Sequence, residues 1–293
     1  MEIWHSKHDL LRMDRFREKG PLVLVPTMGA LHQGHLSLVK LASELGPVVV
    51  TIFVNPTQFG PNEDFASYPR TLTHDLELLR ELPVAGVFAP EVGEIYGEGL
   101  ETSILPGKRA RGLCGGSRPE HFSGVLTVVA KLFGLVRPDV AVFGRKDAQQ
   151  CLVIGQMVED LKMQIQLVDG PTLREKDGLA MSSRNRYLSG PQHEQALCLS
   201  RALSAGRRLL EQGNRSRADV QQTMLEILSQ ADSIDYAEVR QVPNLEINDV
   251  VAGKTLLAVA ARVGPARLID NFVLDVDEQK VSDSFLLGTG RQS

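Results

Sequence analysis

The stretch that decides the fold is residues 26–38, PTMGALHQGHLSL. It follows the apolar run PLVLV (21–25) and leads into the amphipathic segment HLSLVKLASEL (35–45). An apolar strand that passes through glycines into a helix is the ligand-binding turn of an open parallel sheet. The start of the helix there offers free N–H groups and the positive end of its dipole, which favour an anion. His32 and His35 lie at this turn.

Two imidazoles beside a helix dipole could donate hydrogen bonds to phosphate oxygens and to the charge that develops as pyrophosphate leaves. The alternative is that His32 is an exposed loop residue and His35 a helix-cap residue, neither with a ligand. We favour the anion site, because both histidines occur in one HxGH unit between an apolar strand and an amphipathic helix.

Short apolar runs and longer helical patterns alternate over the first 170 residues. Strands are expected at 22–26, 48–54, 84–89, 140–143 and 165–168, and helices at 35–45, 71–81, 123–136 and 147–161. Several strands are rich in Val and Ile, as expected when both faces of a sheet are covered. The alternation predicts an α/β fold, a Rossmann-like parallel sheet with right-handed crossovers.

The pattern changes near VDGPTLREKDG (168–178), where Gly170 and Pro171 interrupt the chain. Helices at 191–212 and 216–230 precede strands at 233–240, 255–263 and 266–274, an order that predicts a small α+β domain. We therefore expect a nucleotide-binding domain over 1–172, a smaller α+β domain over 173–283 that carries MSSRN (181–185), and a flexible tail over 284–293.

Composition excludes several classes of protein. The 293 residues carry a net charge of −4, which gives no reason to expect a nucleic-acid partner. Cys114, Cys151 and Cys198 are far apart, so neither a disulfide framework nor a zinc site is expected. The charged N-terminus lacks a signal-peptide core, and no apolar run reaches the ~20 residues that span a bilayer. We expect a cytoplasmic protein with no membrane partner.

The phosphate-binding motifs GxGxxG and GxxxxGK[ST] do not occur. The HxGH turn instead resembles the HIGH-type signature of the nucleotidyltransferase superfamily, which includes class I aminoacyl-tRNA synthetases. Those proteins pair it with a KMSKS-like phosphate-binding element. In this chain MSSRN follows the predicted boundary, and Ser182, Ser183 and Arg184 supply two hydroxyls and a guanidinium for phosphate oxygens.

Two further segments follow predicted strands, so they should lie at the same edge of the sheet. FVNPTQFGPNEDFASYPRT (53–71) contains Gln58, an amide that could orient a hydroxy acid without adding negative charge. VFGRKDAQQ (142–150) places Lys146 to reach phosphate and Asp147 to accept from ribose hydroxyls. The alternatives are a surface loop for the first segment and an ordinary Lys–Asp surface pair for the second.

The glycine-rich segment GLCGGSRPEHFSG (112–124) precedes an apolar helical pattern. We expect a mobile loop that could close over the site and bring Arg118 and His121 to it. A plain flexible connection explains the same composition.

These segments, in this order and from about residue 1 to 283, resemble the pantothenate synthetase (pantoate–β-alanine ligase) family. The resemblance rests on PTMGALHQGHLSLV (26–39), FVNPTQFGPNEDFASYPRT (53–71), FGRKDAQQ (143–150) and REKDGLAMSSRN (174–185). It implies ATP-dependent condensation of pantoate with β-alanine. A pantoyl-adenylate forms with release of pyrophosphate, and the amine of β-alanine then displaces AMP.

The resemblance implies roles for matched positions: His35 as catalytic histidine with His32 as its partner, and Lys146 on phosphate. Gln58 and Gln150 would bind pantoate, with Asn55 and Tyr68 beside it. Leu173 and Met181 would contact adenine. The residues expected to contact ATP are Met28, Gly29, Ala30, Leu31, His32, Gln33, Gly34, His35, Gly144, Arg145, Lys146, Asp147, Leu173, Met181, Ser182, Ser183 and Arg184; Arg145 has no separate role. Mg²⁺ on the phosphates and a homodimer are also implied, while no protein metal ligand is assigned.

Two alternative functions remain open on the sequence. One is another HxGH nucleotidyltransferase, with adenylyl or cytidylyl transfer, that would keep the nucleotide on its product. The other is a tRNA-binding, synthetase-like protein, for which LSRALSAGRRLLEQGNRSR (199–217) would be the basic face, although a solvated helix explains that stretch. No residue is identified as a general base for the amine step.

Overall fold

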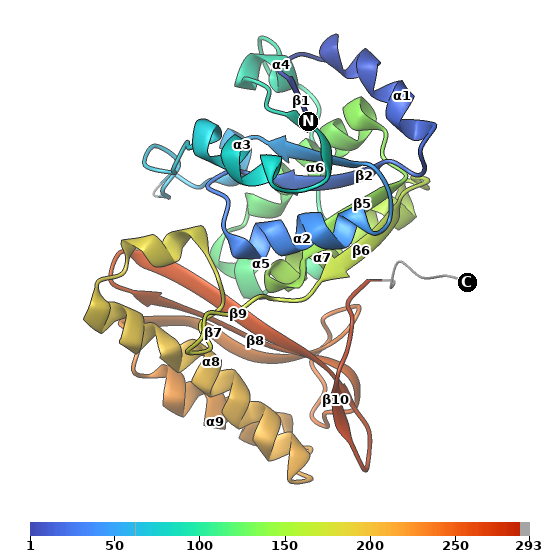
Figure 1. The fold of residues 1–293 in the computed structure, drawn as a ribbon. Coiled ribbons are helices and arrows are strands. Elements are labelled where there is room, and N and C mark those ends of the chain that lie inside the picture. The colour runs from blue at the N-terminus through green and yellow to red at the C-terminus, as the bar shows by residue number, and fades with distance from the viewer. Residues whose placement is uncertain (62, 288–293) are drawn as a thin grey trace.

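The computed structural model describes residues 1–61 and 63–287, which form two sheets with their helices (Figure 1). The first sheet has six parallel strands in the order β1-β4-β3-β2-β5-β6. Their bounds are β1 Glu2–Trp4, β2 Val23–Thr27, β3 Val48–Ile52, β4 Val84–Phe88, β5 Val140–Gly144 and β6 Gln166–Gly170. From β2 the chain adds β3 and β4 on one side and then β5 and β6 on the other, while β1, the first strand in the chain, lies at the edge beside β4.

Helices cover both faces of this sheet, as the Val-rich strands predict. Val23 and Val25 pack with α2 on one face, while Leu22 and Leu24 pack with α6 and α7 on the other. The helices of this part are α1 (Asp14–Arg17), α2 (Gln33–Ser43), α3 (Leu72–Arg80), α4 (Val92–Tyr96), α5 (Leu113–Ser117), α6 (His121–Val136) and α7 (Ala148–Asp160).

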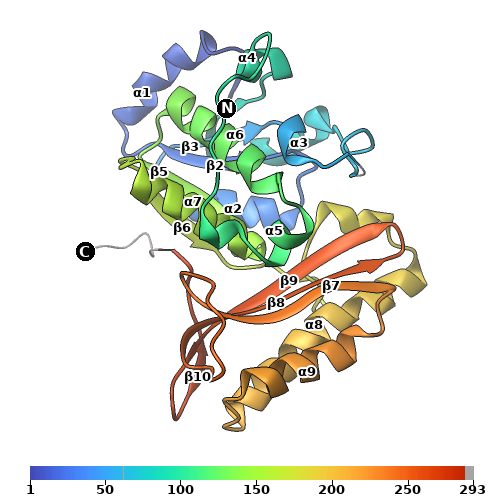
Figure 2. The ribbon, with the colours of Figure 1, turned by 180° about the vertical axis from the view of Figure 1, so that it is seen from behind.

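The second sheet is antiparallel, in the order β10-β9-β8-β7. It consists of β7 Ser233–Gln241, β8 Gly253–Val263, β9 Ala266–Val276 and β10 Val281–Asp283, and follows α8 (Gly190–Glu211) and α9 (Arg217–Leu228). The two helices cover its far face, and the near face lies against the first part of the chain (Figure 2). The predicted fold class, a Rossmann-like α/β domain followed by a smaller α+β domain, is confirmed. The boundary at 172/173 stays a prediction.

Three segments differ most from the sequence-based expectations, which also missed the short elements α1, α4 and β10. β1 was not predicted, because three residues of mixed polarity give no period; Trp4 is nevertheless buried against Gly86. The expected loop 112–124 contains α5 and the first turn of α6.

The third difference concerns the predicted flexible tail. Residues 284–287 pack on the first sheet, where the N–H groups of Leu286 and Leu287 donate to the buried carboxylate of Asp169. The rest of that prediction, 288–293, lies outside the described residues. In the described residues no helix is long and apolar enough to cross a membrane.

Candidate active site

The predicted motifs meet at the carboxyl edge of the parallel sheet. After β2 the chain continues to β3 on one side, and after β5 it continues to β6 on the other side. The loops that follow β2 and β5 therefore diverge and leave a crevice between them. A cavity of about 270 Å³ lies there, and residues of β9 from the second sheet help to line it. The topology therefore explains why segments far apart in the sequence share one site.

Most of the predicted site residues line this cavity. They are Met28, His32, Gly34, His35, Asn55, Gln58, Tyr68, Gly144, Lys146, Asp147, Gln150, Leu173, Met181, Ser182, Ser183 and Arg184. The remaining predicted ATP contacts are not among the lining residues. Gly29, Ala30 and Leu31 form the turn behind it, Gln33 is exposed, and Arg145 pairs with Asp169 (2.6 Å).

The HxGH turn is held by a buried carboxylate that sequence analysis missed. Asp75 on α3 accepts from the backbone N–H groups of Ala30 (2.9 Å) and Leu31 (2.8 Å), and from the hydroxyl of Thr71 (3.2 Å). Ala30 has φ +50°, a region that L-residues seldom adopt. Charge-assisted hydrogen bonds to a fully buried carboxylate offset that strain and fix the turn. An acidic residue in the first turn of a helix is too common to reveal this role.

Backbone contacts set the tautomers of the two histidines. His32 is the N-cap of α2, and its Nδ1 accepts from the N–H of Gly34 (3.1 Å). His35 returns the contact, since its Nδ1 accepts from the N–H of His32 (3.4 Å). Nδ1 is an acceptor in both rings, so each neutral imidazole carries its proton on Nε2. A Cβ at residue 34 would lie 2.9 Å from the His32 ring, so a glycine there lets the ring keep this position.

Both imidazoles are neutral near pH 7. Burial lowers the pKa of His35 to about 3, with the neighbouring His32 and Lys146 adding to the effect. Burial also lowers the pKa of His32 to about 4, and Lys146 is the next cause. The ring centroids lie 4.1 Å apart, so a charge on one ring disfavours a charge on the other. The pair therefore consists of two neutral donors.

Gln58 is oriented by Asn55. The Asn55 side chain is almost fully buried, donates to Oε1 of Gln58 (3.1 Å) and to the carbonyl of Gly124 (3.2 Å), and accepts from the hydroxyl of Tyr96 (2.6 Å). Asn55 was predicted to line the pantoate side. Because the polar atoms of Asn55 already bind groups within the protein, the geometry favours a supporting role for Asn55. Gln58 is then the nearer candidate for substrate binding.

Arg118 and His121 form contacts beside Gln58. The guanidinium of Arg118 donates to the Glu63 carboxylate and to the backbone carbonyl of Gln58 (3.1 Å), and Nδ1 of His121 contacts the same carbonyl (2.9 Å). Burial works to raise the pKa of Glu63, but the hydrogen bond and charge of Arg118 outweigh it and hold that pKa below its usual value. Burial lowers the pKa of His121 to about 4. The segment that carries Arg118 and His121 is thus tied to Gln58 beside the cavity.

Residues 109–114 are joined to α7 by the side chain of Gln149. Its buried amide accepts from the N–H of Cys114 (2.9 Å) and donates to the carbonyls of Arg109 (3.0 Å) and Gly112 (3.1 Å). Sequence analysis gave Gln149 no role, since only the fold brings it to these groups.

Arg184 in the MSSRN segment has a protein partner, Asp64. Its guanidinium donates to both carboxylate oxygens of Asp64, at 3.0 and 2.8 Å. Burial disfavours its charged form, but Asp64 outweighs this and raises the pKa of Arg184 above its usual value. Burial is the main cause that raises the pKa of the nearby Tyr68, which a hydrogen bond from Ser183 partly offsets. MSSRN is therefore joined to the segment that carries Gln58.

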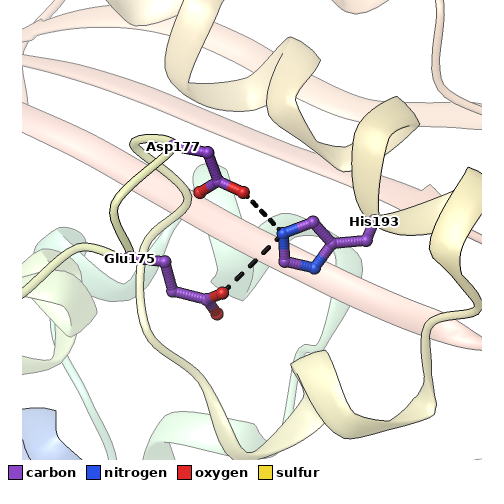
Figure 3. A group of neighbouring side chains, drawn as sticks. All are labelled: Glu175, Asp177 and His193. Atoms are coloured by element: carbon purple, nitrogen blue, oxygen red, sulfur yellow. Dashed lines mark hydrogen bonds and ion pairs between the residues drawn. The ribbon is translucent and has the colours of Figure 1, made fainter.

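A group that could hold a metal lies near MSSRN but outside the cavity lining. Figure 3 shows Glu175 and Asp177 facing the imidazole of His193 on α8. Nε2 of His193 lies 2.7 Å from Asp177 and 3.7 Å from Glu175. Mg²⁺ prefers an octahedron of oxygens, which two carboxylates and an imidazole match poorly. The group is explained as a polar cluster that links α8 to the segment before MSSRN.

Several known proteins that are similar to this chain belong to one family. The sequence model of the family described as pantoate-beta-alanine ligase matches residues 2–273. The chain belongs to this family. A pantothenate synthetase of Carboxydothermus hydrogenoformans is 50% identical over 265 residues, covering 89% of this chain and 94% of that protein.

Solved structures of the pantoate–β-alanine ligase family share the fold. A pantothenate synthetase from Thermus thermophilus has a TM-score of 0.87 at 42% identity and covers 92% of this chain and 98% of its own. A pantoate-beta-alanine ligase from Francisella tularensis, in a complex described as containing "Beta-gamma ATP" and β-alanine, has a TM-score of 0.77 at 35% identity. It covers 93% of this chain and 97% of its own. These matches favour the ligase hypothesis over a nucleotidyltransferase that keeps the nucleotide on its product.

Proposed function

We propose that this cavity joins pantoate to β-alanine with consumption of ATP, through a pantoyl-adenylate. The chain is a ligase of the family identified above, and ATP is its co-substrate. The observation that carries the proposal is the meeting of the His32–His35 pair and Lys146 with Gln58 and Gln150 in one cavity. In this proposal the two histidines and Lys146 would donate hydrogen bonds to phosphate, and the two amides would hold the hydroxy acid beside it.

The first step is adenylate formation. An oxygen of the pantoate carboxylate attacks the α-phosphorus of ATP, and the electron pair of the broken P–O bond leaves with pyrophosphate. Nε2–H of His35 and of His32, together with Lys146, would stabilise the charge that develops on the phosphates. Gln58 and Gln150 would hold pantoate in line. Asp147 would accept from the ribose, while Leu173 and Met181 would border adenine.

Mg²⁺ fits the oxygen donors that the cavity offers, the hydroxyls of Ser182 and Ser183 and the carboxylate of Asp147. When bound, the ion would neutralise phosphate charge.

The second step is amide formation. The amine of β-alanine attacks the acyl carbon, and the C–O bond to AMP breaks with its electron pair going to AMP. The amine loses its proton in this step, and no side chain is assigned as the acceptor. Positioning of the amine beside the acyl carbon would supply most of the acceleration.

The proposal also covers the cellular location and the oligomeric state of the enzyme. A cytoplasmic location fits a reaction that uses ATP and a chain whose three cysteines, all within the described residues, are free thiols. A homodimer is proposed from the family resemblance.

An AMP-release assay tests the function. The protein is incubated with ATP, Mg²⁺ and pantoate, first without and then with β-alanine. We expect pyrophosphate without β-alanine, and sustained release of free AMP once β-alanine is added. A product that still retains the nucleotide after β-alanine is added would instead support the transferase alternative. In a separate filter-binding test, retention of tRNA by the protein would support the synthetase-like alternative.

A further inference from the structure

Two consecutive residues of β9, Asp270 and Asn271, have no part in the proposed function, yet both are buried and both line the cavity. Their exposed fractions are 3% and 5%. They belong to the second sheet, whereas the motif residues that define the nucleotide site come from the first sheet and the segments after it. Two buried polar side chains in the middle of an apolar strand need an explanation.

Asn271 holds the turn that carries Lys146. Its Nδ2 donates to the carbonyl of Lys146 (2.7 Å) and to the carbonyl of Arg145 (3.1 Å). Both acceptors are carbonyls, so the amide nitrogen must face them. These carbonyls belong to the 3₁₀ turn Arg145–Asp147 at the end of β5, and the second sheet thereby fixes the orientation of that turn.

Asp270 holds the segment that leads to MSSRN. Its carboxylate accepts from both terminal nitrogens of Arg174, at 2.6 and 2.9 Å. Arg174 also donates to the carbonyl of Gly178 (3.0 Å), and the N–H of Met181 donates to the carbonyl of Leu173 (3.0 Å). Residues 173–181 therefore form a closed hairpin whose end is anchored on Asp270 and whose continuation is Ser182–Arg184.

The two contacts lie on opposite faces of one strand. Side chains alternate along a strand, and in β9 Val273 packs toward the first part of the chain while Leu268 and Leu274 pack toward α8 and α9. Asn271 shares its face with Val273, and Asp270 shares its face with Leu268. Because β9 is paired with β8 along its whole length, it is a rigid spacer between the Arg145–Asp147 turn and the hairpin.

We propose that Asp270 and Asn271 are positioning residues for adenylate formation, which set the distance between Lys146 and the Ser182–Arg184 segment around the triphosphate. This inference rests on the proposed function. The pair acts through backbone groups and Arg174, not on the reacting atoms. A displacement of about 1 Å at such a site can cost about 10² in rate.

The test measures the two chemical steps separately in the full-length protein. Enzyme in excess over ATP is mixed with pantoate, Mg²⁺ and pyrophosphatase. Samples are quenched at intervals to measure how fast the adenylate forms. When the ATP is consumed, β-alanine is added and AMP release is timed. For Asn271→Ala and Asp270→Asn we expect adenylate formation to slow by about 10- to 100-fold, with amide formation within about twofold of the wild-type rate, because the adenylate is already in place.

Two comparisons separate positioning from loss of structure. Val273→Ala removes a buried side chain on the same face of β9, and should leave the ratio of the two rates unchanged. Asn271→Asp keeps the shape but turns an oxygen toward two carbonyls, so it should slow adenylate formation more than Asn271→Ala does.

Equal slowing of both steps in the Asn271 and Asp270 variants, or adenylate formation within twofold of wild type, would overturn the inference. If the wild-type protein itself released no pyrophosphate from ATP and pantoate, the proposed function would fail instead.

Discussion

At the scale of the residue, the proposed mechanism depends most on His35. Its backbone-bound Nδ1 leaves Nε2–H as a donor, and burial keeps the ring neutral. We expect His35→Ala to slow pyrophosphate release with pantoate by about 10²–10³, the cost of losing one transition-state donor. Lys40→Ala, an exposed position on the same helix, is the control. Pyrophosphate release close to the wild-type rate in His35→Ala would remove His35 from the mechanism.

Residues within local motifs could be predicted, but their long-range partners could not. HxGH and GRKD place their side chains by strand-to-helix geometry, which short sequence patterns encode. Asp75 and Asn271 bind backbone groups that are distant in the chain, and no local sequence pattern around either residue indicates these contacts. The pairing of Arg184 with Asp64 likewise depends on the fold, since 120 positions separate them.

At the scale of the element, the segment around α5 depends on Gln149, whose amide joins three backbone groups of residues 109–114. Gln149→Ala leaves these groups without partners, so we expect the segment to open more often and trypsin to cleave after Arg109 or Arg111 several times faster. Gln156→Ala is the matched control, because that amide donates to Asp160 on the same helix. Identical cleavage rates in the two variants would mean that other contacts hold the segment.

Elements with a clear period were predicted to within a few residues, while irregular ones were missed. The central strands and the long helices have buried faces that recur at the expected spacing. The segment 112–124 contains four glycines and was predicted as a loop, yet α5 forms there, since Gln149 and the packing of Leu113 and Cys114 outweigh the low helix propensity of glycine. Tertiary contacts of this kind cannot be predicted from a local sequence pattern.

At the scale of the whole molecule, residues 284–287 tie the end of the chain to the first sheet. Two N–H groups donate to Asp169, Leu286 is buried, and Phe285 stacks on Arg145 at 4.8 Å. A chain that ends at Asp283 should lose about 1–3 kcal/mol, because Asp169 then keeps a buried charge with fewer partners. Thermal unfolding of this variant is compared with that of a chain ending at Leu287. Equal midpoints would show that the segment adds no stability.

Stability of the whole molecule should also depend on pH through its buried histidines. The folded-state pKa is about 3 for His35 and about 4 for His32 and His121, against 6.5 for the unperturbed side chain. Below pH 6.5 the unfolded chain binds protons that the folded chain cannot, so stability is complete above that pH and is lost as the pH falls toward 4. Each such histidine should cost about 1 kcal/mol at pH 5.5.

The contribution of one histidine can be isolated by substitution. His35→Asn keeps an acceptor for the N–H of His32 but cannot take up a proton, so its unfolding free energy should fall less than that of the wild type between pH 7.5 and 5.5. Other titrating groups cancel in this difference. His74→Asn is the control, because that imidazole is largely exposed. If His35→Asn and the wild type lost the same stability over this range, the ring would be charged in the folded protein, and the neutral-donor description of the HxGH pair would have to be abandoned.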